Sequence, residues 1–481
     1  MDMRWENFIG GGYRPASRGL YFEDLNPATG NLVAQVARSG SEDLQWAIDS
    51  AKEAFGSWSK TSPEARAGIL YRIGEGLVLR EEEFALAETL DTGKPIAFSR
   101  SVDIPRAAAN FRFFAAAATQ FASEAHEMPG RAINYTLRQP VGIVGCIAPW
   151  NLPLYLMSWK IAPALAAGNC VVAKPSEFSP VTAAMLGEVC NEAGLPPGVL
   201  SILQGFGSEI GEAIVDHPDV KAISFTGGTQ TGARIASRTA PAFKKISLEL
   251  GGKNPCIVFA DCDYPRTLRE IERLAFSNSG QICLCGSRIL VEQSIYERLS
   301  ADLVNAATQL HPADPLDPAT RMGALISEPH LQKVHGYVEQ ARSEGGRILC
   351  GGQRLPGAGA FYPPTLIDGL GPEAACNREE IFGPVATLQP FATEEEALEL
   401  ANHSAYGLAA TLWTENLSRA HRMASALQTG IVWVNTWLLR DLRTPFGGVK
   451  HSGTGREGGW EAMRFFTEPK NVCINFGPRN A

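Results

Sequence analysis

Between residues 140 and 250 the chain alternates short apolar runs with amphipathic segments, and this alternation constrains the fold more than any other feature of the sequence. We predict strands at 142–148, 169–173, 199–203 and 222–225, and helices at 158–166, 181–193, 210–216 and 232–238. Strands and helices that alternate in this way form a parallel sheet with helices on both faces. The segment therefore predicts an α/β domain.

A second cycle of the same kind begins near residue 252. We expect its strands at 254–259, 288–292, 347–350 and 386–390, and its helices at 264–277, 294–309 and 327–344. Ahead of the first cycle, residues 43–58, 63–80 and 83–92 have helical periodicity. Because 481 residues are too many for a single hydrophobic core, we predict two α/β lobes.

Two further segments alternate like strands and belong to neither cycle. Residues 131–138 (RAINYTLR) follow a Met-Pro-Gly turn and indicate an edge or interface strand. Residues 470–476 (KNVCINF) indicate a terminal strand that pairs outside its own lobe.

The composition excludes several classes of function. A net charge of −8 and a pI of about 5.6 disfavour nucleic-acid binding. The start of the chain lacks the pattern of a signal peptide, and no apolar run is long enough to span a membrane. We therefore expect a cytoplasmic protein without membrane contact, whose ten cysteines are reduced thiols.

Cys283 is the first candidate for chemistry. It follows a polar, glycine-containing turn after a predicted helix, in FSNSGQIC, and this context suits an accessible thiol. The alternative is a buried core cysteine, which is the usual state of this residue type. Cys283 and Cys285 also resemble a redox or metal-binding pair, but no second Cys/His pair with zinc-like spacing lies nearby, so we expect no metal.

Glu249 and Asn151 are candidates for acid–base chemistry and oxyanion binding. Glu249 lies between two leucines before a Gly-Gly turn, where partial burial would raise its pKa toward that of a general base. Asn151 follows the predicted strand 142–148, where its amide could donate to an oxyanion. A salt-bridged glutamate and a turn asparagine are the alternatives.

Glycine-rich segments after other strands predict nucleotide binding. Residues 224–232 (SFTGGTQTG) lie between a strand and a helix, where glycines allow a pyrophosphate to approach the helix N-terminus. Lys174 and Glu177, in KPSE, follow another strand and could bind the two hydroxyls of a ribose. The segment 205–211 resembles a dinucleotide fingerprint but has the wrong spacing, and we interpret it as a turn.

Together these segments resemble the aldehyde dehydrogenase superfamily over nearly the whole chain. Seven motifs occur in the family's order: PWN at 149–151, KPSE at 174–177, FTGGTQTG at 225–232, LELGGKN at 248–254, GQIC at 280–283, EEIFGPV at 379–385 and PFGG at 445–448. Each motif is weak alone, but the seven in sequence are very specific.

The resemblance implies an NAD-dependent, non-acylating dehydrogenase with assigned residues. Cys283 would be the nucleophile, Asn151 and the Cys283 backbone N–H the oxyanion hole, and Glu249 the base for hydrolysis. The implied NAD-binding residues are Pro149, Trp150, Lys174, Ser176, Glu177, Gly207, Phe225, Gly227, Gly228, Gly232, Leu250, Glu380 and Phe382. The carboxylate of Glu177 would repel the 2′-phosphate of NADP, so NAD is the expected cofactor.

The resemblance also implies the architecture. A Rossmann-type NAD-binding domain would comprise residues 1–122 and 142–250, with 450–468 returning to it, and an α/β catalytic domain would comprise 251–449. Residues 123–141 and 469–481 would form a small β oligomerisation arm. We therefore expect a homodimer or homotetramer.

Two arginines bear on the substrate. Arg106 and Arg440 are on segments that contribute to the substrate tunnel in this superfamily, and the arginine fork suits a carboxylate. Their surroundings resemble the 2-aminomuconic and 2-hydroxymuconic semialdehyde dehydrogenases of aromatic-ring degradation. The resemblance implies a carboxylated semialdehyde as the small-molecule partner, bound by Arg106 and Arg440 together with Leu152, Tyr155 and Trp159.

Three alternatives remain at this point. A dehydrogenase of a small neutral or cationic aldehyde, such as betaine aldehyde, would carry aromatic boxes instead of tunnel arginines. A CoA-acylating enzyme would transfer the thioester, whereas Glu249 favours hydrolysis. A non-catalytic scaffold on the same fold would not need to retain nucleophile, base and oxyanion donor together.

Overall fold

The computed structural model describes residues 3–477, and within them the first predicted cycle contributes five strands to an eight-stranded sheet. Its spatial order is β22 (Gly453–Thr454), β12 (Lys245–Glu249), β11 (Val220–Thr226), β8 (Ile143–Ile147), β9 (Cys170–Lys174), β10 (Leu200–Ile202), β2 (Asn7–Ile9) and β3 (Gly12–Arg14). The strands from β12 to β10 are parallel. The strand order reverses between β8 and β11, and ligands of such sheets bind beyond the carboxyl ends at this point.

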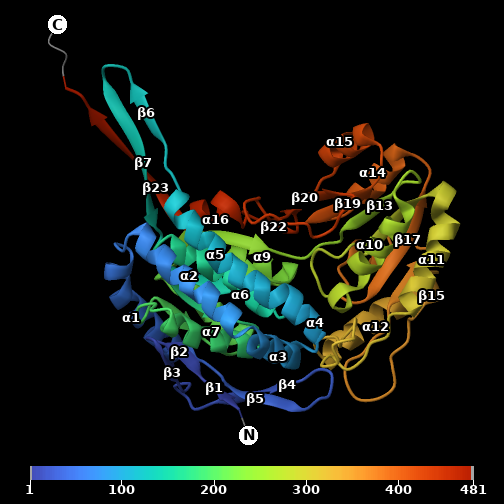
Figure 1. Cartoon of the computed structure of the whole chain (residues 1–481), viewed down its shortest axis with the longest axis horizontal. Helices are drawn as coiled ribbons and strands as arrows, with labels where there is room; N and C mark the ends of the chain where they lie inside the picture. The colour runs from blue at the N-terminus through green and yellow to red at the C-terminus, as the bar shows by residue number, and fades with distance from the viewer. Residues whose placement is uncertain (1–2, 478–481) are drawn as a thin grey trace.

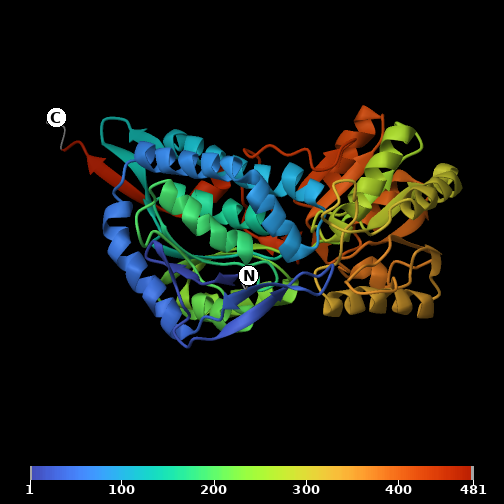
Figure 2. The same ribbon diagram turned by 60° about the horizontal axis from the view of Figure 1, so that its bottom comes forward.

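Helices cover both faces of this sheet (Figure 2). On one face lie α1 (Ser41–Trp58), α8 (Glu212–Asp216) and α9 (Thr229–Thr239), and on the other α6 (Pro153–Ala166) and α7 (Val181–Glu192). An outer layer packs over α6 and α7 and contains α2 (Pro63–Leu79), α3 (Glu81–Thr92) and α5 (Ile104–Gln120). Every residue of α6 is buried, so the helix has no polar face, and the periodicity of the sequence predicted only its second half, 158–166.

The second lobe is built on a seven-stranded sheet (Figure 1). Its order is β15 (Arg347–Cys350), β16 (Thr365–Asp368), β17 (Val385–Phe391), β14 (Arg288–Glu292), β13 (Pro255–Val258), β19 (Ala409–Trp413) and β20 (Ile431–Val434). The helices of this lobe are α10 (Tyr264–Phe276), α11 (Tyr296–Thr308), α12 (Glu328–Ser343), α13 (Ala375–Arg378), α14 (Glu394–Asn402) and α15 (Leu417–Ala426). All neighbouring strands except β15 and β16 run parallel, which confirms the predicted α/β class.

A three-stranded arm projects from the first lobe (Figure 1). The long strand β7 (Ala132–Pro140) pairs with β6 (Ala125–Met128) on one edge and with β23 (Thr467–Asn475) on the other. The two strands predicted at 131–138 and 470–476 are thus neighbours in one sheet. Residues 1–2 and 478–481, at the outer ends of the predicted domain and arm, lie outside the described residues.

Strands near the N-terminus were not predicted from the sequence. Besides β2 and β3, the strands β1 (Arg4–Trp5), β5 (Leu32–Ala37) and β4 (Tyr21–Leu25) form a separate small sheet. Across residues 3–477, no helix has both the length and the apolar character needed to cross a membrane.

Candidate active site

Cys283 lies in a turn between the short helix η4 (Ser277–Gly280) and β14, and a left-handed backbone delivers it there. Asn278, Ser279 and Gly280 have φ values of 49°, 54° and 72°. Only glycine adopts this conformation freely, and for other residue types the backbone strain costs about 1–3 kcal/mol per residue. The Ser279 hydroxyl donates to the Gly323 carbonyl at 3.0 Å, and the Ile326 N–H donates to the Gln281 side chain at 3.0 Å, so neighbouring loops hold the turn in place.

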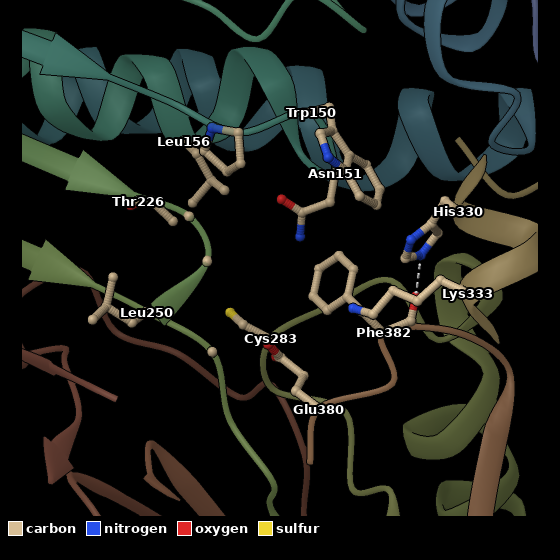
Figure 3. Close-up of a pocket in the computed structure, with 14 residues that line it drawn as sticks. Trp150, Asn151, Leu156, Thr226, Leu250, Cys283, His330, Lys333, Glu380 and Phe382 are labelled. Atoms are coloured by element: carbon tan, nitrogen blue, oxygen red, sulfur yellow. Dashed lines mark hydrogen bonds between the residues drawn. The ribbon is translucent and has the colours of Figure 1, made fainter. Parts of the chain in front are cut away.

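A cavity of ≈ 230 Å³ opens beside Cys283, between the two lobes (Figure 3). Nine predicted site residues line it: Pro149, Trp150, Asn151, Gly227, Gly228, Leu250, Cys283, Glu380 and Phe382. It also contains five residues that the sequence did not single out: Leu156, Thr226, Gly251, His330 and Lys333. The fold thus brings together motifs that are separated by more than two hundred residues.

Asn151 belongs to the loop that joins β8 to α6, and its side-chain amide points into the cavity (Figure 3). One N–H of that amide donates to the backbone carbonyl of Gln281 at 2.9 Å, which leaves the second N–H for a ligand. Within residues 3–477, no acceptor bonds to the backbone N–H of Cys283. These two free donors are suited to an oxyanion.

Glu249 ends β12 and is buried, and neither of its carboxyl oxygens has a hydrogen-bond partner among the described residues. Burial, and next the negative charge of Glu457, hold its pKa well above the ordinary value of a glutamate. A Cβ at Gly447 would lie 2.7 Å from Glu249 Oε1, so the glycine of the PFGG motif makes room for the carboxyl group. Burial thus opposes the ionisation of Glu249, which acts as a base once its proton has left.

The surroundings of Cys283 oppose the ionisation of its thiol as well. Burial raises its pKa above the ordinary value, as do the carboxyls of Glu380 and Glu249, whereas the charge of Arg440 lowers it. The sequence led us to expect an accessible thiolate, but the sulfur is half-buried and its ionisation is opposed. Cys285 is buried in the core of the second lobe, and burial raises its pKa to about 12.

The turn after β11 fits the pyrophosphate of a dinucleotide. No atom lies within 4 Å of the position that a Cβ would take on Gly228, so a ligand can approach the backbone at the start of α9. The hydroxyl oxygen of Thr226 is buried at the cavity without a partner. Both observations fit a polar ligand at the carboxyl end of β11.

Two residues assigned to the cofactor act behind this turn instead of lining the cavity. The ring of Phe225 occupies the space that a Cβ at Gly227 would need, and the side chain of Leu250 does the same at Gly232. Gly232 lies inside α9, three residues beyond the turn. Phe225 and Gly232 therefore shape the turn through packing and do not line the cavity, unlike what the motif suggested.

Lys174 and Glu177 lie near the carboxyl end of β9, and their charged groups are 3.0 Å apart. Burial lowers the pKa of Lys174. The Ser176 hydroxyl accepts a hydrogen bond from the N–H of Phe178. Gly207 begins the π-helix η2 (Gly207–Gly211), and no atom lies within 4 Å of the position that a Cβ would take on it. We interpreted the fingerprint-like segment 205–211 as a turn, but only residues 205–206 precede the π-helix, and residues 207–211 form it.

Glu380 and Phe382 come from the second lobe and line the cavity beside Cys283 (Figure 3). The N–H of Gly252 donates to Glu380 at 2.9 Å, and burial raises the pKa of this carboxyl to about 7. Phe382 has a φ of 60°. Its carbonyl lies 2.7 Å from His330 Nε2, and burial lowers the pKa of His330 to about 4, so this neutral ring donates from Nε2.

A second, larger cavity of ≈ 970 Å³ contains Arg106, from α5, and Arg440, from the loop after β20. Tyr155 lies between them: Arg440 donates to its hydroxyl, and the Arg106 guanidinium is 5.8 Å from the centre of its ring. Arg440 also lies over Phe446, 4.1 Å from the ring centre, and 5.3 Å from the ring centre of Trp159. Leu152 and Trp159 are buried and do not line this cavity.

Comparisons with known proteins agree with this geometry. The model of the family described as "Aldehyde dehydrogenase family" matches residues 13–472. The chain belongs to the aldehyde dehydrogenase family. The chain is 49% identical to the 2-aminomuconic semialdehyde dehydrogenase of Danio rerio, over 98% of this chain and 99% of the relative. It is 48% identical to the 2-hydroxymuconic semialdehyde dehydrogenase of Pseudomonas sp. (strain CF600), over 98% and 99%.

The family's fold is equally clear in solved structures. The NAD+ complex of an aldehyde dehydrogenase from Bacillus cereus superposes with a TM-score of 0.97 at 38% identity, covering 98% of this chain and 97% of that one. The expected fold, with its two α/β lobes, is therefore confirmed.

Proposed function

We propose that this aldehyde dehydrogenase uses NAD to oxidise a semialdehyde that carries a carboxylate, 2-aminomuconic or 2-hydroxymuconic semialdehyde, to the dicarboxylic acid. The observation that carries the proposal is the pair Arg106 and Arg440 in the larger cavity. Within residues 3–477 neither guanidinium forms an ion pair with a carboxylate. Half-buried arginines that lack a carboxylate partner suit an anionic substrate, and the muconic semialdehyde dehydrogenases among the relatives, such as those of Danio rerio and Pseudomonas sp. (strain CF600), support the same substrate class.

Arg440 connects this anion site with the reaction centre. Its positive charge lowers the pKa of both Glu249 and Cys283, so it lies within electrostatic reach of the two reacting groups. Its contacts with Tyr155 and Phe446 fix the plane of the guanidinium. A short substrate can therefore place its carboxylate on Arg440 and its aldehyde on Cys283.

The proposed chemistry assigns one task to each residue. The Cys283 sulfur, once deprotonated, adds to the aldehyde carbon, and the Asn151 amide stabilises the oxyanion. Bound NAD would supply the acceptor for the hydride that this carbon must lose before Cys283 can carry a thioester. Glu249, once ionised, takes a proton from the water that attacks the thioester, and the acid departs from the restored thiol. Because Glu249 can deprotonate the attacking water, we propose that the thioester is hydrolysed and not transferred to CoA.

The residues proposed to hold NAD line the cavity beside Cys283 or lie near the carboxyl end of β9. Gly228 and the N-terminus of α9 would receive the pyrophosphate, and Glu177 and Lys174 the adenosine ribose. Glu380 would bind the nicotinamide ribose, with Phe382 and Trp150 beside the ring. A carboxylate at Glu177 favours NAD over NADP.

The test is a comparison of kcat/KM for the two muconic semialdehydes with that for an unsubstituted aliphatic aldehyde. We expect Arg440→Ala to raise KM for the carboxylated substrates about 10- to 100-fold, the equivalent of a lost charged hydrogen bond, and to spare the aliphatic one. Arg443→Ala is the matched control, because Arg443 lines the same cavity but is paired with Asp441.

Each outcome of that test bears on a different part of the proposal. An unchanged KM in the Arg440 variant would exclude the arginine clamp. A preference for the aliphatic aldehyde would exclude the muconic substrates and leave the reaction class intact. Failure to reduce NAD with any aldehyde would favour a non-catalytic protein on this fold.

We also propose that the arm pairs with further copies of the chain. Four large apolar side chains on or beside its strands are exposed: Met128, Leu137, Ile474 and Phe476. Strands β6 and β23 each leave one edge without a neighbour among the described strands, and such edges pair readily. Light scattering of Ile474→Lys should show smaller particles than the unmodified dimer or tetramer, and an unchanged mass would refute this role.

A further inference from the structure

Lys94 is a buried lysine that the proposed chemistry does not use. It follows the C-terminus of α3, where Gly93 adopts a left-handed conformation, and it is 1% exposed. An ammonium group in such a position is costly unless all three of its N–H groups have acceptors. Lys94 has three: the carboxylates of Asp103 and Glu88, the latter at 3.5 Å, and the backbone carbonyl of Asn151 at 2.9 Å.

The third acceptor is the important one, because the Asn151 carbonyl belongs to the residue whose side chain faces Cys283. This carbonyl also accepts a hydrogen bond from the Asn278 side chain at 3.1 Å. Both lone pairs of this carbonyl oxygen therefore accept a hydrogen bond, one from Lys94 in the first lobe and one from Asn278 in the turn that carries the nucleophile. A bond from an ammonium group is also stronger than one from a neutral donor.

We propose that Lys94 is a positioning residue for the oxyanion site: together with Asn278 it fixes the backbone of Asn151, and so aims the Asn151 amide at the space above Cys283. This inference rests on the proposed role of Asn151 as oxyanion donor. A carbonyl that is held at two points fixes the peptide plane, and with it the direction of the Asn151 side chain. The 2.9 Å bond from that side chain to Gln281 then fixes its rotamer.

Lys94 also contacts the segment directly before α5, the helix that carries Arg106. Asp103 is the last residue of the π-helix η1 (Ser99–Asp103), directly before α5, and Arg106 follows three residues later. Lys94 thus bridges the start of the helix that carries Arg106 and the loop that carries Asn151. The ammonium group of Lys94 therefore helps to fix the distance between the proposed anion site at Arg106 and the oxyanion donor Asn151.

A double-mutant cycle separates positioning from a general structural role. Because small misplacements of reacting groups cost on the order of 10²-fold in rate, we expect Lys94→Met to lower kcat by about that factor. If Lys94 acts through Asn151, the same substitution in an Asn151→Ala background should change kcat by less than about 2-fold. NAD binding, measured by fluorescence titration, should stay unchanged in all four proteins.

Lys253→Met is the matched control. Lys253 is also a lysine with 1% exposure, but its ammonium group has no hydrogen-bond partner among the described residues, so it donates no bond to the backbone of Asn151. Lys253→Met should change kcat by the same factor in the wild-type and the Asn151→Ala backgrounds. If Lys94→Met does not fold, Asn278→Ala removes the other donor to the Asn151 carbonyl and enters the same cycle.

The outcomes distinguish this inference from the function on which it rests. If Asn151→Ala alone leaves kcat unchanged, the oxyanion role of Asn151 is wrong. If Asn151→Ala lowers kcat but Lys94→Met lowers it by equal factors in both backgrounds, the oxyanion role stands and the positioning role of Lys94 is overturned.

Discussion

Lys160 Nζ lies 2.6 Å from Glu457 Oε1, although 297 residues separate the two in the chain. Both side chains are buried, and the Ser224 hydroxyl donates to the same carboxylate oxygen at 3.0 Å. The pair lies close enough to Glu249 to act on its ionisation, since Glu457 raises the pKa of Glu249 and Lys160 lowers it. This buried pair therefore helps to set the pH at which Glu249 becomes a base.

The first prediction concerns that pH. The ionised form of Glu249 is the active one, so hydrolysis should increase as pH rises through its raised pKa. Removing the negative charge in Glu457→Gln should lower this pKa and move the acid limb of the kcat profile down by on the order of one pH unit. Glu461→Gln, four residues away and paired with Arg464 at the surface, is the control and should leave the profile in place. A limb that stays in place, or moves to higher pH, in Glu457→Gln would contradict the assignment.

The second prediction concerns Cys283. Because burial and two carboxyls raise the pKa of its thiol, iodoacetamide should label it slowly at neutral pH and steadily faster from about pH 7 to about pH 10. Cys473 on the arm is exposed and would also react, so the experiment uses a Cys473→Ser background. Peptide mass spectrometry follows the labelling. A plateau already reached near neutral pH would show that the resting sulfur is a thiolate.

A third prediction tests the oxyanion donor. The Asn151 amide has one N–H free for a ligand, and loss of one such donor costs on the order of 10²–10³-fold in rate. Asn151→Ala should therefore lower kcat by that factor while the dissociation constant of NAD changes little. Titration of NAD alongside steady-state kinetics measures both. A variant that lost NAD binding and kept its kcat would place Asn151 in the cofactor site instead.

The fourth prediction concerns cofactor choice. Glu177 is anchored by Lys174 beside the proposed ribose site, where its charge opposes a 2′-phosphate. Glu177→Gln should therefore bind NADP more tightly by on the order of 10-fold and bind NAD no better. Glu192→Gln, an exposed carboxylate at the end of α7, is the control. Equal affinities of the wild type and Glu177→Gln for NADP would exclude this selectivity mechanism.

The sequence predicted much of the fold because its strands and helices have clear periods. The strands 288–292 and 347–350 lie where the alternation placed them. Periodicity failed to predict the first turn of α6, because a helix buried on all sides has no polar face. It also failed to predict β19 and β20, which lie in the second sheet although we recognised no helix pattern before them in the sequence. The short N-terminal strands carry too few residues to establish a period.

The candidate site was predictable where a motif named a residue, as for Cys283 and Glu380. Motifs did not reveal that Gly232 packs against Leu250, or that His330 and Lys333 complete the cavity. These facts depend on which loops the two lobes bring face to face. The Lys160–Glu457 pair and the contact of Lys94 with Asn151 likewise join segments that carry no shared local signal.

The contact of Asn151 with Gln281 joins the two lobes at the reaction centre, and this has a consequence for biogenesis. The oxyanion donor comes from one lobe and the nucleophile from the other, so neither lobe alone can form the site. A newly made chain therefore remains chemically silent toward aldehydes until both halves have folded and docked. Recovery of turnover after dilution from denaturant accordingly reports the last step of folding, whereas helical circular dichroism reports the formation of each lobe.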